Sequence, residues 1–515
     1  MKSIFNKNTS LNTKSQRYTE TFLFVIIGLT FLIKIISLGS NSLLVEEAYY
    51  WNYAQHLDFG YLDHPPMVAV LIKLSTYLLG MSEFAIRAPT ILCWLVAAYF
   101  NAKLTNLIEP CTGIYSFFFL SVLPFFFLHS LILTPDAPLI ACWSAALYFL
   151  YRALILNEPQ RWYMAGFWLG LGMLSKYTIV LVGGATVVYI LLTPSLRHWL
   201  FKKEPYLCAA ITFILFIPVI YWNATHDWIS FTFQSSRRFN QPFHFSLPHL
   251  LGLLAFFLMP AGLYGLWDLS KNAIHCTQSS LDTNTKRFML VFTAVPLMFF
   301  IWFSLFHRIK FNWIGPALLA LVPWLAISLK HSPTQKMRNL FNLRNSWKIT
   351  SYSLLACYGL MIFSLISGKP EFAHQLIFKK LLDWQDFTLQ VNSIAQNIEN
   401  KGHPPPIIIP IDVYNINSEL TFYQRKLFKE GQINSIYEMV GQHVFGDNSL
   451  MYKYWPHEDP SSRQIILISE NYQFIENQQN NPKLTNVMPI KSFYSHSMGA
   501  GVKLKPFYYR IARML

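Results

Sequence analysis

Residues 21–38 read TFLFVIIGLTFLIKIISL, an apolar run long enough to cross a bilayer, and residues 46–51 then read EEAYYW. A second polar stretch, GYLDHPP, follows at residues 60–66. Carboxylates, an imidazole and aromatic rings therefore gather where a membrane segment would meet water. Because ionisable groups are costly beside the hydrocarbon layer, we interpret both stretches as parts of a functional site.

The composition is typical of an integral membrane protein. The chain has 515 residues, of which 53% are hydrophobic and 13% charged, too apolar for a soluble multidomain protein. Its formal net charge is +15, but the Lys and Arg residues gather in short loops between apolar runs and form no basic stripe with interleaved aromatic residues. We therefore expect contacts with membrane lipids and no nucleic-acid partner.

The apolar segments predict a polytopic α-helical membrane protein of about 11 to 13 spans, if one span takes about 17 to 25 residues. The segments are 21–39, 84–103, 113–131, 137–155, 163–175, 177–193, 206–223, 247–268, 287–306, 312–329 and 349–367. As one straight helix, residues 163–193 would measure roughly 45 Å, whereas a bilayer core is about 30 Å thick. We therefore predict a break at Ser175-Lys176-Tyr177.

Loop charges predict the orientation of the chain. With that break and a cytoplasmic N-terminus, every loop on the inner side is basic, as the positive-inside bias requires. The opposite, exterior face then collects the ionisable outliers, which are Glu46, Glu47, Asp63, Asp136, Lys176, Arg237, Arg238, Arg308 and Lys310. Such a collection on one membrane face predicts a site there.

The composition changes after Gly368. A β-branched run at 407–413, a helical pattern at 418–427 and a strand-like run at 464–469 predict a small α/β domain on the exterior side. An amphipathic stretch, 376–398, leads into it. We predict two domains, a membrane core at 1–368 and an exterior α/β domain at 369–515.

Glu46 and Glu47 have two interpretations. They can occupy a helix N-terminus, where the macrodipole stabilises an acid by about 0.3 to 1 kcal/mol, or one of them can deprotonate an acceptor hydroxyl. The dipole explains one acid better than two adjacent ones, so we favour the catalytic role. The aromatic residues that follow, Tyr50 among them, suit a helix that lies in the headgroup layer.

The other acids differ in how well a structural role explains them. An Asp63 N-cap would need backbone N–H groups where the chain has Pro65 and Pro66, so Asp63 is available to bind a ligand, a metal or a hydroxyl. A lone histidine such as His64 is as often structural as a ligand. For Asp136, capping by Thr134 explains the sequence as well as function does.

The exterior cations form a second candidate set, Lys176, Arg237, Arg238, Arg308 and Lys310. Each alone could simply extend its charged end toward water. Together on one face they better fit phosphate, which Arg binds with two hydrogen bonds and Lys as a point charge. Acids that activate a hydroxyl, with cations that hold a phosphate leaving group, indicate transfer from a phosphate-linked donor.

Several motifs in order carry a resemblance to a known family. Besides EEAYYW and GYLDHPP, they are Arg87-Ala88-Pro89, TPDAPL at 134–139, LSKYT at 174–178 and KFNW at 310–313. With them the chain resembles the GT-C membrane glycosyltransferases, in the branch of the protein mannosyltransferases, lipid A aminoarabinose transferases and lipopolysaccharide galacturonosyltransferases. The resemblance implies an inverting transferase that takes a sugar from a polyprenyl-phosphate carrier, with an acid of the first exterior loop as base.

The combined hypothesis is a multi-pass glycosyltransferase of a bacterial inner membrane, with its N-terminus in the cytoplasm and its C-terminal domain in the periplasm. The expected catalytic residues are Glu46, Glu47 and Asp63, and the expected substrate-binding residues are Tyr50, His64, Asp136, Lys176, Tyr177, Arg237, Arg238, Arg308 and Lys310. Lipid A, another envelope glycan and a protein stay open as acceptors, and a divalent metal beside the acids stays open as a cofactor. The alternative function is a transporter or flippase of a lipid-linked sugar.

Overall fold

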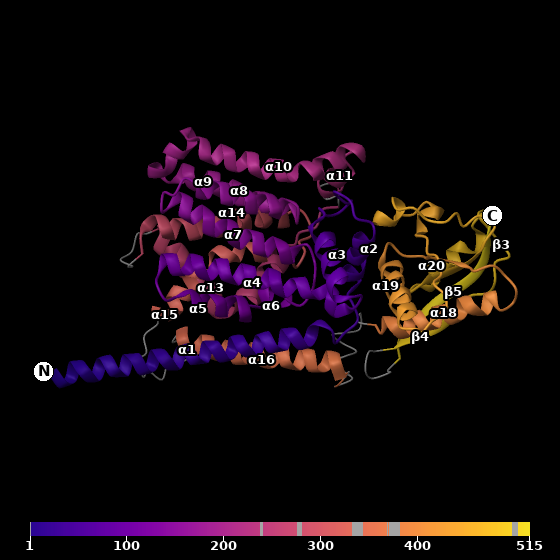
Figure 1. Cartoon of the computed structure of the whole chain (residues 1–515), viewed down its shortest axis with the longest axis horizontal. Helices are drawn as coiled ribbons and strands as arrows, with labels where there is room; N and C mark the ends of the chain where they lie inside the picture. Colours follow the sequence, from indigo (N-terminus) through magenta and orange to yellow (C-terminus); the bar gives the residue numbers. More distant parts are fainter. Residues whose placement is uncertain are drawn as a thin grey trace. The chain divides into compact units, whose positions relative to one another are not determined.

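The computed structural model describes residues 2–236, 240, 242–274, 281–331, 343–367, 369, 382–496 and 503–515. Its described part is mostly helical (Figure 1). The chain divides into two compact units. The helical unit comprises Met1–Ile35, Asp63–Val68 and Thr90–Gly359, and the mixed unit comprises Ile36–Leu62, Ala69–Pro89 and Leu360–Leu515. The boundary that we predict at residue 368 stays a prediction.

Seven described helices are long and apolar enough to cross a membrane. They are α1 (Lys2–Leu38), α4 (Glu83–Ile108), α7 (Asp136–Leu154), α10 (Lys203–Thr225), α13 (Leu247–Ile274), α14 (Thr283–Ser304) and α16 (Leu343–Ser367). In α1, the apolar part is Tyr18–Leu38. The predicted polytopic helical membrane fold is therefore confirmed.

The other expected segments lie on shorter or interrupted helices. These are α5 (Gly113–Val122), α6 (Pro124–Leu128), α8 (Arg161–Met173), η1 (Tyr177–Ile179), α9 (Val180–Leu192), η3 (Gly315–Ala320) and α15 (Val322–His331). Two further helices, η2 (Pro194–Phe201) and α11 (Ile229–Gln234), lie between the expected segments. The segment Tyr177–Leu192 bends by 119° into η2 and adds an eighth span if the bent pair counts as one. Within 113–131 the helix is interrupted where Pro124 begins α6, because proline cannot donate the next helical hydrogen bond.

The predicted break in residues 163–193 is confirmed. Helix α8 ends at Met173, and Lys176 is extended, with φ −159° and ψ 132°. The Ser175 hydroxyl donates to the carbonyl of Pro135 at 2.7 Å, which ties the break to the start of α7. The break therefore places Lys176 beside α7.

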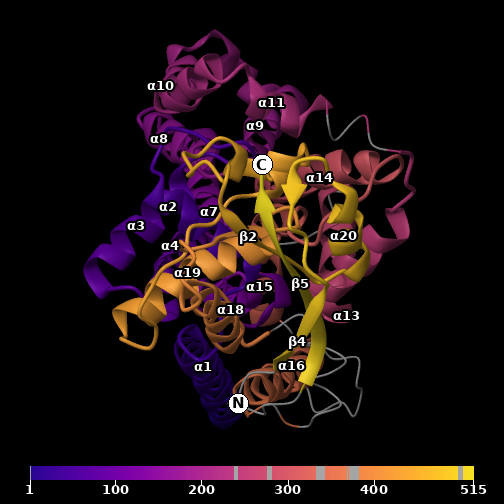
Figure 2. The same cartoon turned by 90° about the vertical axis from the view of Figure 1, so that its right-hand side faces the viewer.

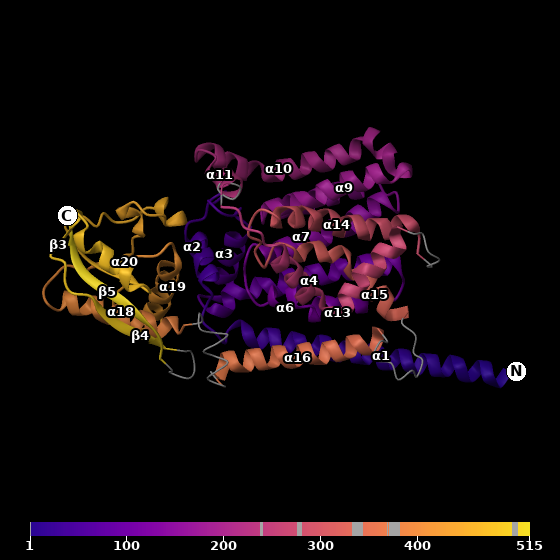
Figure 3. The same ribbon diagram turned by 180° about the vertical axis from the view of Figure 1, so that it is seen from behind.

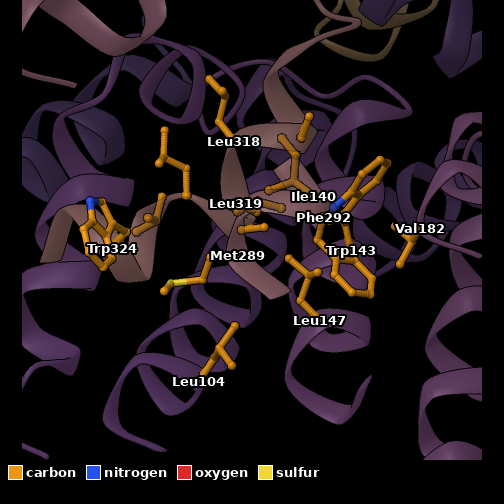
Figure 4. Packing of buried hydrophobic residues seen from close by; sticks show 14 of the residues in the cluster. Leu104, Ile140, Trp143, Leu147, Val182, Met289, Phe292, Leu318, Leu319 and Trp324 are labelled. Atoms are coloured by element: carbon orange, nitrogen blue, oxygen red, sulfur yellow. The ribbon is translucent and has the colours of Figure 1, made fainter. Parts of the chain in front are cut away.

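The core of the helical unit includes residues of α7, α14 and η3. Figure 4 shows Trp143 and Leu147 from α7 packed near Phe292 of α14 and Leu319 of η3. In Figures 1 and 3, α8 runs beside α7 and α10, and α9 runs beside α14. Close packing of these helices positions the break that carries Lys176.

Glycine permits the close approach of α8 to α10. A Cβ atom on Gly166 would lie 2.5 Å from the carbonyl oxygen of Cys208, whereas one on Gly184 would meet nothing within 4 Å. We expect Gly166→Ala to destabilise the protein by about 1–3 kcal/mol, because the backbone of α10 must move. Gly184→Ala is the matched control and should be neutral or slightly stabilising. Thermal unfolding of both variants in detergent checks this, and equal midpoints would contradict it.

The mixed unit contains a five-stranded sheet in the order β1-β2-β5-β3, with β4 paired to β5. Its strands are β1 (Ile407–Pro410), β2 (Gln464–Ser469), β3 (Leu484–Thr485), β4 (Lys491–His496) and β5 (Lys503–Met514). Strands β1 and β2 are parallel, and β5 runs antiparallel to β2, β3 and β4. Figure 2 shows β2 and β4 beside β5. The predicted small α/β region is therefore present, and its second predicted strand coincides with β2.

The helices and turns of the mixed unit include two segments from early in the chain. They are α2 (Val45–Gln55), α3 (Met67–Leu79), α18 (Trp384–Glu399), α19 (Asn415–Lys429), η4 (Gln442–Phe445), η5 (Leu450–Lys453), α20 (Tyr472–Asn477) and η6 (Gln478–Asn480). The first two residues of α3 belong to the helical unit. The predicted helix 418–427 lies inside α19. The predicted stretch 376–398 overlaps α18, and its part before 382 lies outside the described residues.

Helix α2 packs on α19, more than 360 residues later in the chain. Trp51 is 1% exposed and meets the ring of Phe422 at 5.1 Å, edge to face. Tyr49 is 2% exposed and lies 4.9 Å from the ring of Tyr414. Tyr49 and Trp51 therefore lie in the interior of the mixed unit, and the prediction that this helix lies in the headgroup layer stays a prediction.

Candidate functional site

Glu47 is held in a buried ion pair. Arg87 donates from Nη2 to Glu47 Oε2 at 2.7 Å and from Nε to Oε1 at 2.9 Å, and the backbone N–H of Leu44 donates to Oε2 at 2.9 Å. The Glu47 side chain is fully buried and that of Arg87 is 5% exposed. The other N–H groups of Arg87 donate to three carbonyls of the segment before α2. This pair fixes the start of α2.

Glu46, by contrast, is exposed. Its side chain makes no hydrogen bond or ion pair with any residue that the structure describes. Neighbouring helical side chains point in different directions, so Glu46 faces outward while Glu47 is buried. Of the two expected bases, Glu46 is the one that a substrate hydroxyl could reach.

Tyr50, the third expected residue of this helix, is 6% exposed. Its ring lies 5.8 Å from that of Tyr49 and 5.6 Å from that of Tyr53. The predicted substrate-binding role of Tyr50 stays a prediction.

Helix α19 carries a polar stripe, Glu419, Tyr423 and Lys426, at the helical spacing i, i+4, i+7. Lys426 Nζ lies 2.8 Å from Glu83 Oε1, and the Tyr423 hydroxyl donates to the same oxygen at 3.1 Å. Glu419, the third member, is fully buried, and neither of its oxygens has a hydrogen-bond partner among the described residues. This stripe was not predicted, although the spacing of polar residues inside an amphipathic helix is a signal for it.

The pH dependence of stability should report on Glu419. Burial, and then the Glu47 carboxylate, raise the pKa of Glu419 well above its usual range, with Glu46 and Glu83 adding and Arg87 opposing. The folded chain then keeps a proton that the unfolded chain loses at about pH 4.3, so the free energy of unfolding falls by about 1.4 kcal/mol per pH unit above that pH, until the folded-state pKa is reached. We expect Glu419→Gln, which cannot ionise, to remove this decline. Thermal unfolding between pH 4.5 and 8 checks it.

The exposed Glu430 on the same segment of chain provides the matched control. Glu430→Gln should keep the decline of the unmodified protein. Equal slopes for the unmodified protein and Glu419→Gln would contradict the assignment.

A second polar cluster lies in the helical unit. Asp136 Oδ1 pairs with Lys176 Nζ at 2.7 Å, and Asn312 donates to Asp136 Oδ2 at 2.5 Å. Asp136 is 1% exposed. Thr134 does not cap α7, since its hydroxyl has no hydrogen-bond partner in the described structure and the N-cap is Pro135. Asp136 therefore holds Lys176 in place, which the capping interpretation did not predict.

A cavity of about 250 Å³ adjoins this pair. Its polar lining includes His64, Lys176, Tyr177 and Gln234, and its apolar lining includes Phe303. The Tyr177 hydroxyl lies 2.9 Å from that of Ser230. The cavity thus brings three of the expected substrate-binding residues together beside Asp136, in reach of a small polar group.

Asp63 contacts a residue that lines this cavity, because Nε2 of Gln234 donates a hydrogen bond to the backbone carbonyl of Asp63. Helix α3 begins at Met67, whose N–H donates to Leu174 rather than to a cap. This agrees with the prediction that Asp63 does not cap that helix. His129 was not predicted as a site residue, and its ring is buried near Asp136 and stacks on Phe311, with centroids 6.1 Å apart.

The remaining expected cations are not part of this cavity as described. Arg308 and Lys310 are exposed in the segment after α14 and are not among its lining residues. Arg237 and Arg238 lie outside the described residues.

The expected site residues are divided between the two units. The mixed unit contains Glu46, Glu47 and Tyr50. The helical unit contains Asp63, His64, Asp136, Lys176, Tyr177, Arg308 and Lys310. That all of them share one pocket stays a prediction. In the described part of the chain, no group of three or more His, Cys, Asp or Glu residues could hold a metal ion.

Comparison with known proteins gives concordant matches. The family model of the dolichyl-phosphate-mannose-protein mannosyltransferases matches residues 63–222, which contain Asp63, His64, Asp136 and Lys176. The lipid A galacturonosyltransferase RgtD of Rhizobium johnstonii is 26% identical over 212 residues, 40% of this chain. The match spans 44% of that relative, less than half of its length.

Solved structures extend the likeness to the whole fold. The crystal structure of ArnT from Cupriavidus metallidurans in the apo state matches with a TM-score of 0.64 over 96% of this chain and 98% of that one, at 13% identity. The structure of the same protein bound to undecaprenyl phosphate matches with a TM-score of 0.63 over 95% and 98%, also at 13% identity. The chain therefore shares the fold of the solved ArnT structures, and its residues 63–222 are similar to the dolichyl-phosphate-mannose-protein mannosyltransferase family.

Proposed function

We propose that the chain is an inverting glycosyltransferase that moves a sugar from a polyprenyl-phosphate carrier to an acceptor of the cell envelope. Glu46 takes the proton of the acceptor hydroxyl, whose oxygen attacks the anomeric carbon. The bond from that carbon to the phosphate oxygen breaks, and the lipid phosphate leaves. The observation that carries this proposal is the difference between the two acids of α2: Glu47 is buried in an ion pair with Arg87, whereas Glu46 is exposed and can accept a proton.

The cavity beside Lys176 is the proposed site for the phosphate end of the donor. Lys176 is already paired with Asp136, so the cavity has little net charge of its own. Arg237, Arg238, Arg308 and Lys310 are therefore proposed to supply the further positive charge that a phosphate needs. His64 and Tyr177 offer hydrogen-bonding groups at the cavity wall, and Asp63 and Tyr50 are proposed to orient the sugar or the acceptor.

The relatives support the choice of substrates. One solved relative binds undecaprenyl phosphate, and another relative is named for transfer of galacturonic acid to lipid A. A polyprenyl-phosphate donor and an envelope acceptor, lipid A among the candidates, are proposed on that basis. The proposed location is a bacterial inner membrane, with the N-terminus in the cytoplasm and the residues after 368 in the periplasm.

The test uses the purified full chain, an undecaprenyl-phosphate-linked sugar and an extract of envelope glycolipids. We expect release of undecaprenyl phosphate that depends on the acceptor extract. The alternative, a flippase, would instead move the intact donor across a vesicle membrane without cleaving it. Transport without release would therefore reject the transferase and support the flippase.

A further inference from the structure

A polar pocket of about 150 Å³ lies within the mixed unit, and neither Glu47 nor Arg87 lines it. Its walls are the C-terminal end of α2, one face of α19 and the segments 436–441 and 452–457. Helix α19 contributes residues at the spacing i, i+4, i+7 and i+8, which are Asn417, Thr421, Gln424 and Arg425. The pocket therefore follows one face of a helix that is already anchored to α2.

The lining combines several hydrogen-bonding groups with flat rings. Thr421 offers a hydroxyl, Arg425 a guanidinium and Glu438 a carboxylate. The Trp455 ring stacks on the imidazole of His56, with centroids 4.6 Å apart and planes 15° apart. Donors and acceptors beside an aromatic face suit a polyhydroxylated ring, whose hydroxyls both donate and accept and whose C–H face packs on an aromatic ring.

The size of the pocket limits the ligand. The pocket volume is about 150 Å³. Pockets for drug-sized ligands are larger, about 300–1,000 Å³. The pocket therefore suits a single ring rather than a lipid chain or a nucleotide.

One buried amide nitrogen in the pocket has no hydrogen-bond partner among the described residues. Asn417 is 3% exposed, and its Nδ2 has no hydrogen-bond partner in the described structure. Its carbonyl oxygen receives a long hydrogen bond, 3.4 Å, from Thr421. A buried N–H that is left unpaired costs free energy, which a ligand hydroxyl would recover. Asn417 therefore indicates that the pocket is completed by a ligand.

We propose that this pocket binds one sugar ring of the acceptor, so that the acceptor is a glycan or a glycolipid rather than a protein. This inference rests on the proposed transferase function. Helix α2 links the two sites, because Glu46 stands near its start and Asn52, a pocket residue, lies six residues later, roughly 9 Å along the axis. A ring held in the pocket lies within the length of a short oligosaccharide from the reacting hydroxyl.

The test measures binding of methyl glycosides of glucose, galactose, mannose, glucosamine and galacturonic acid to the purified full chain by saturation-transfer difference NMR. We expect at least one glycoside to bind saturably. Asn417→Leu and Glu438→Gln should each weaken its binding by about tenfold or more. Asn417→Leu removes a donor that has no partner and one long hydrogen bond from Thr421, and Glu438 is exposed, so both variants should fold. Glu430→Gln, at an exposed residue outside the pocket, should bind as the unmodified chain does.

Two results would overturn the proposal: no saturable binding of any of these glycosides, or unchanged binding in both pocket variants. The measurement needs no donor, so it is independent of catalysis. Glycoside binding should persist in Glu46→Gln. If binding is absent while the chain still releases undecaprenyl phosphate, the pocket proposal alone fails. If binding is present without release, the transferase proposal alone fails.

Discussion

Replacement of Glu46 by glutamine should reduce the release of undecaprenyl phosphate by about 10²- to 10⁴-fold, the usual contribution of a general base. Glutamine has nearly the same shape and cannot accept the proton. The Glu46 side chain is exposed and makes no hydrogen bond or ion pair with a described residue, so its replacement should leave the thermal unfolding midpoint unchanged. A radiolabelled lipid-linked sugar donor, followed by separation of lipid phosphate from donor, measures the rate.

Glu47→Gln provides the comparison within the same helix. It removes one charge of the buried pair with Arg87, so it should lower stability as well as activity. The two variants therefore separate chemistry from folding, since only Glu46→Gln should be inactive and fully stable. Full activity in Glu46→Gln would remove Glu46 as the base. Equal losses of stability in both variants would contradict the proposal that Glu47 is structural and Glu46 is not.

The membrane part of the fold follows from local sequence. A run of apolar residues such as 21–38 is enough to predict a span, because the backbone must satisfy its hydrogen bonds within the helix. The break at Lys176 was also predictable, since one helix through residues 163–193 would exceed the bilayer. Pro194 likewise marks the end of α9, because proline cannot continue a helix, but the 119° angle of the bend into η2 is not given by local sequence.

The mixed unit was harder to predict because its contacts are distant in sequence. Strand β2 is a buried β-branched run and was found, but β5 was not, since its pattern KLKPFYYRIARM mixes charged and aromatic residues. The packing of α2 on α19 joins residues more than 360 positions apart, and a single sequence gives no signal for it. The burial of Trp51 of α2 against Phe422 of α19 was therefore not predicted.

The candidate site was predicted by residue type but not by pairing. Asp136 and Lys176 were expected to bind separate parts of the substrates, whereas they bind each other. Likewise, Glu46 and Glu47 are equivalent in the sequence, and Arg87 distinguishes them in the structure. Such pairings form through tertiary contacts forty residues apart in the chain.

Loss of the Arg87 guanidinium should destabilise the mixed unit by about 3–5 kcal/mol, because Arg87→Met leaves the Glu47 carboxylate buried without its partner. The loss should extend to α2 and α19, since Arg87 also donates to the carbonyls that shape the segment before α2. Hydrogen exchange of the peptides that span 45–55 and 415–429 measures this local opening.

The double variant Glu47→Leu with Arg87→Met tests the cause. A buried ion pair replaced by apolar residues of similar volume is often tolerated, so the double variant should recover much of the stability that Arg87→Met loses. The recovery measures the cost of the unpaired carboxylate, and any remaining deficit measures the lost hydrogen bonds to the carbonyls. If the double variant is no more stable than Arg87→Met, the guanidinium stabilises α2 through those carbonyls and not through Glu47, and the exposed position of Glu46 then needs another explanation.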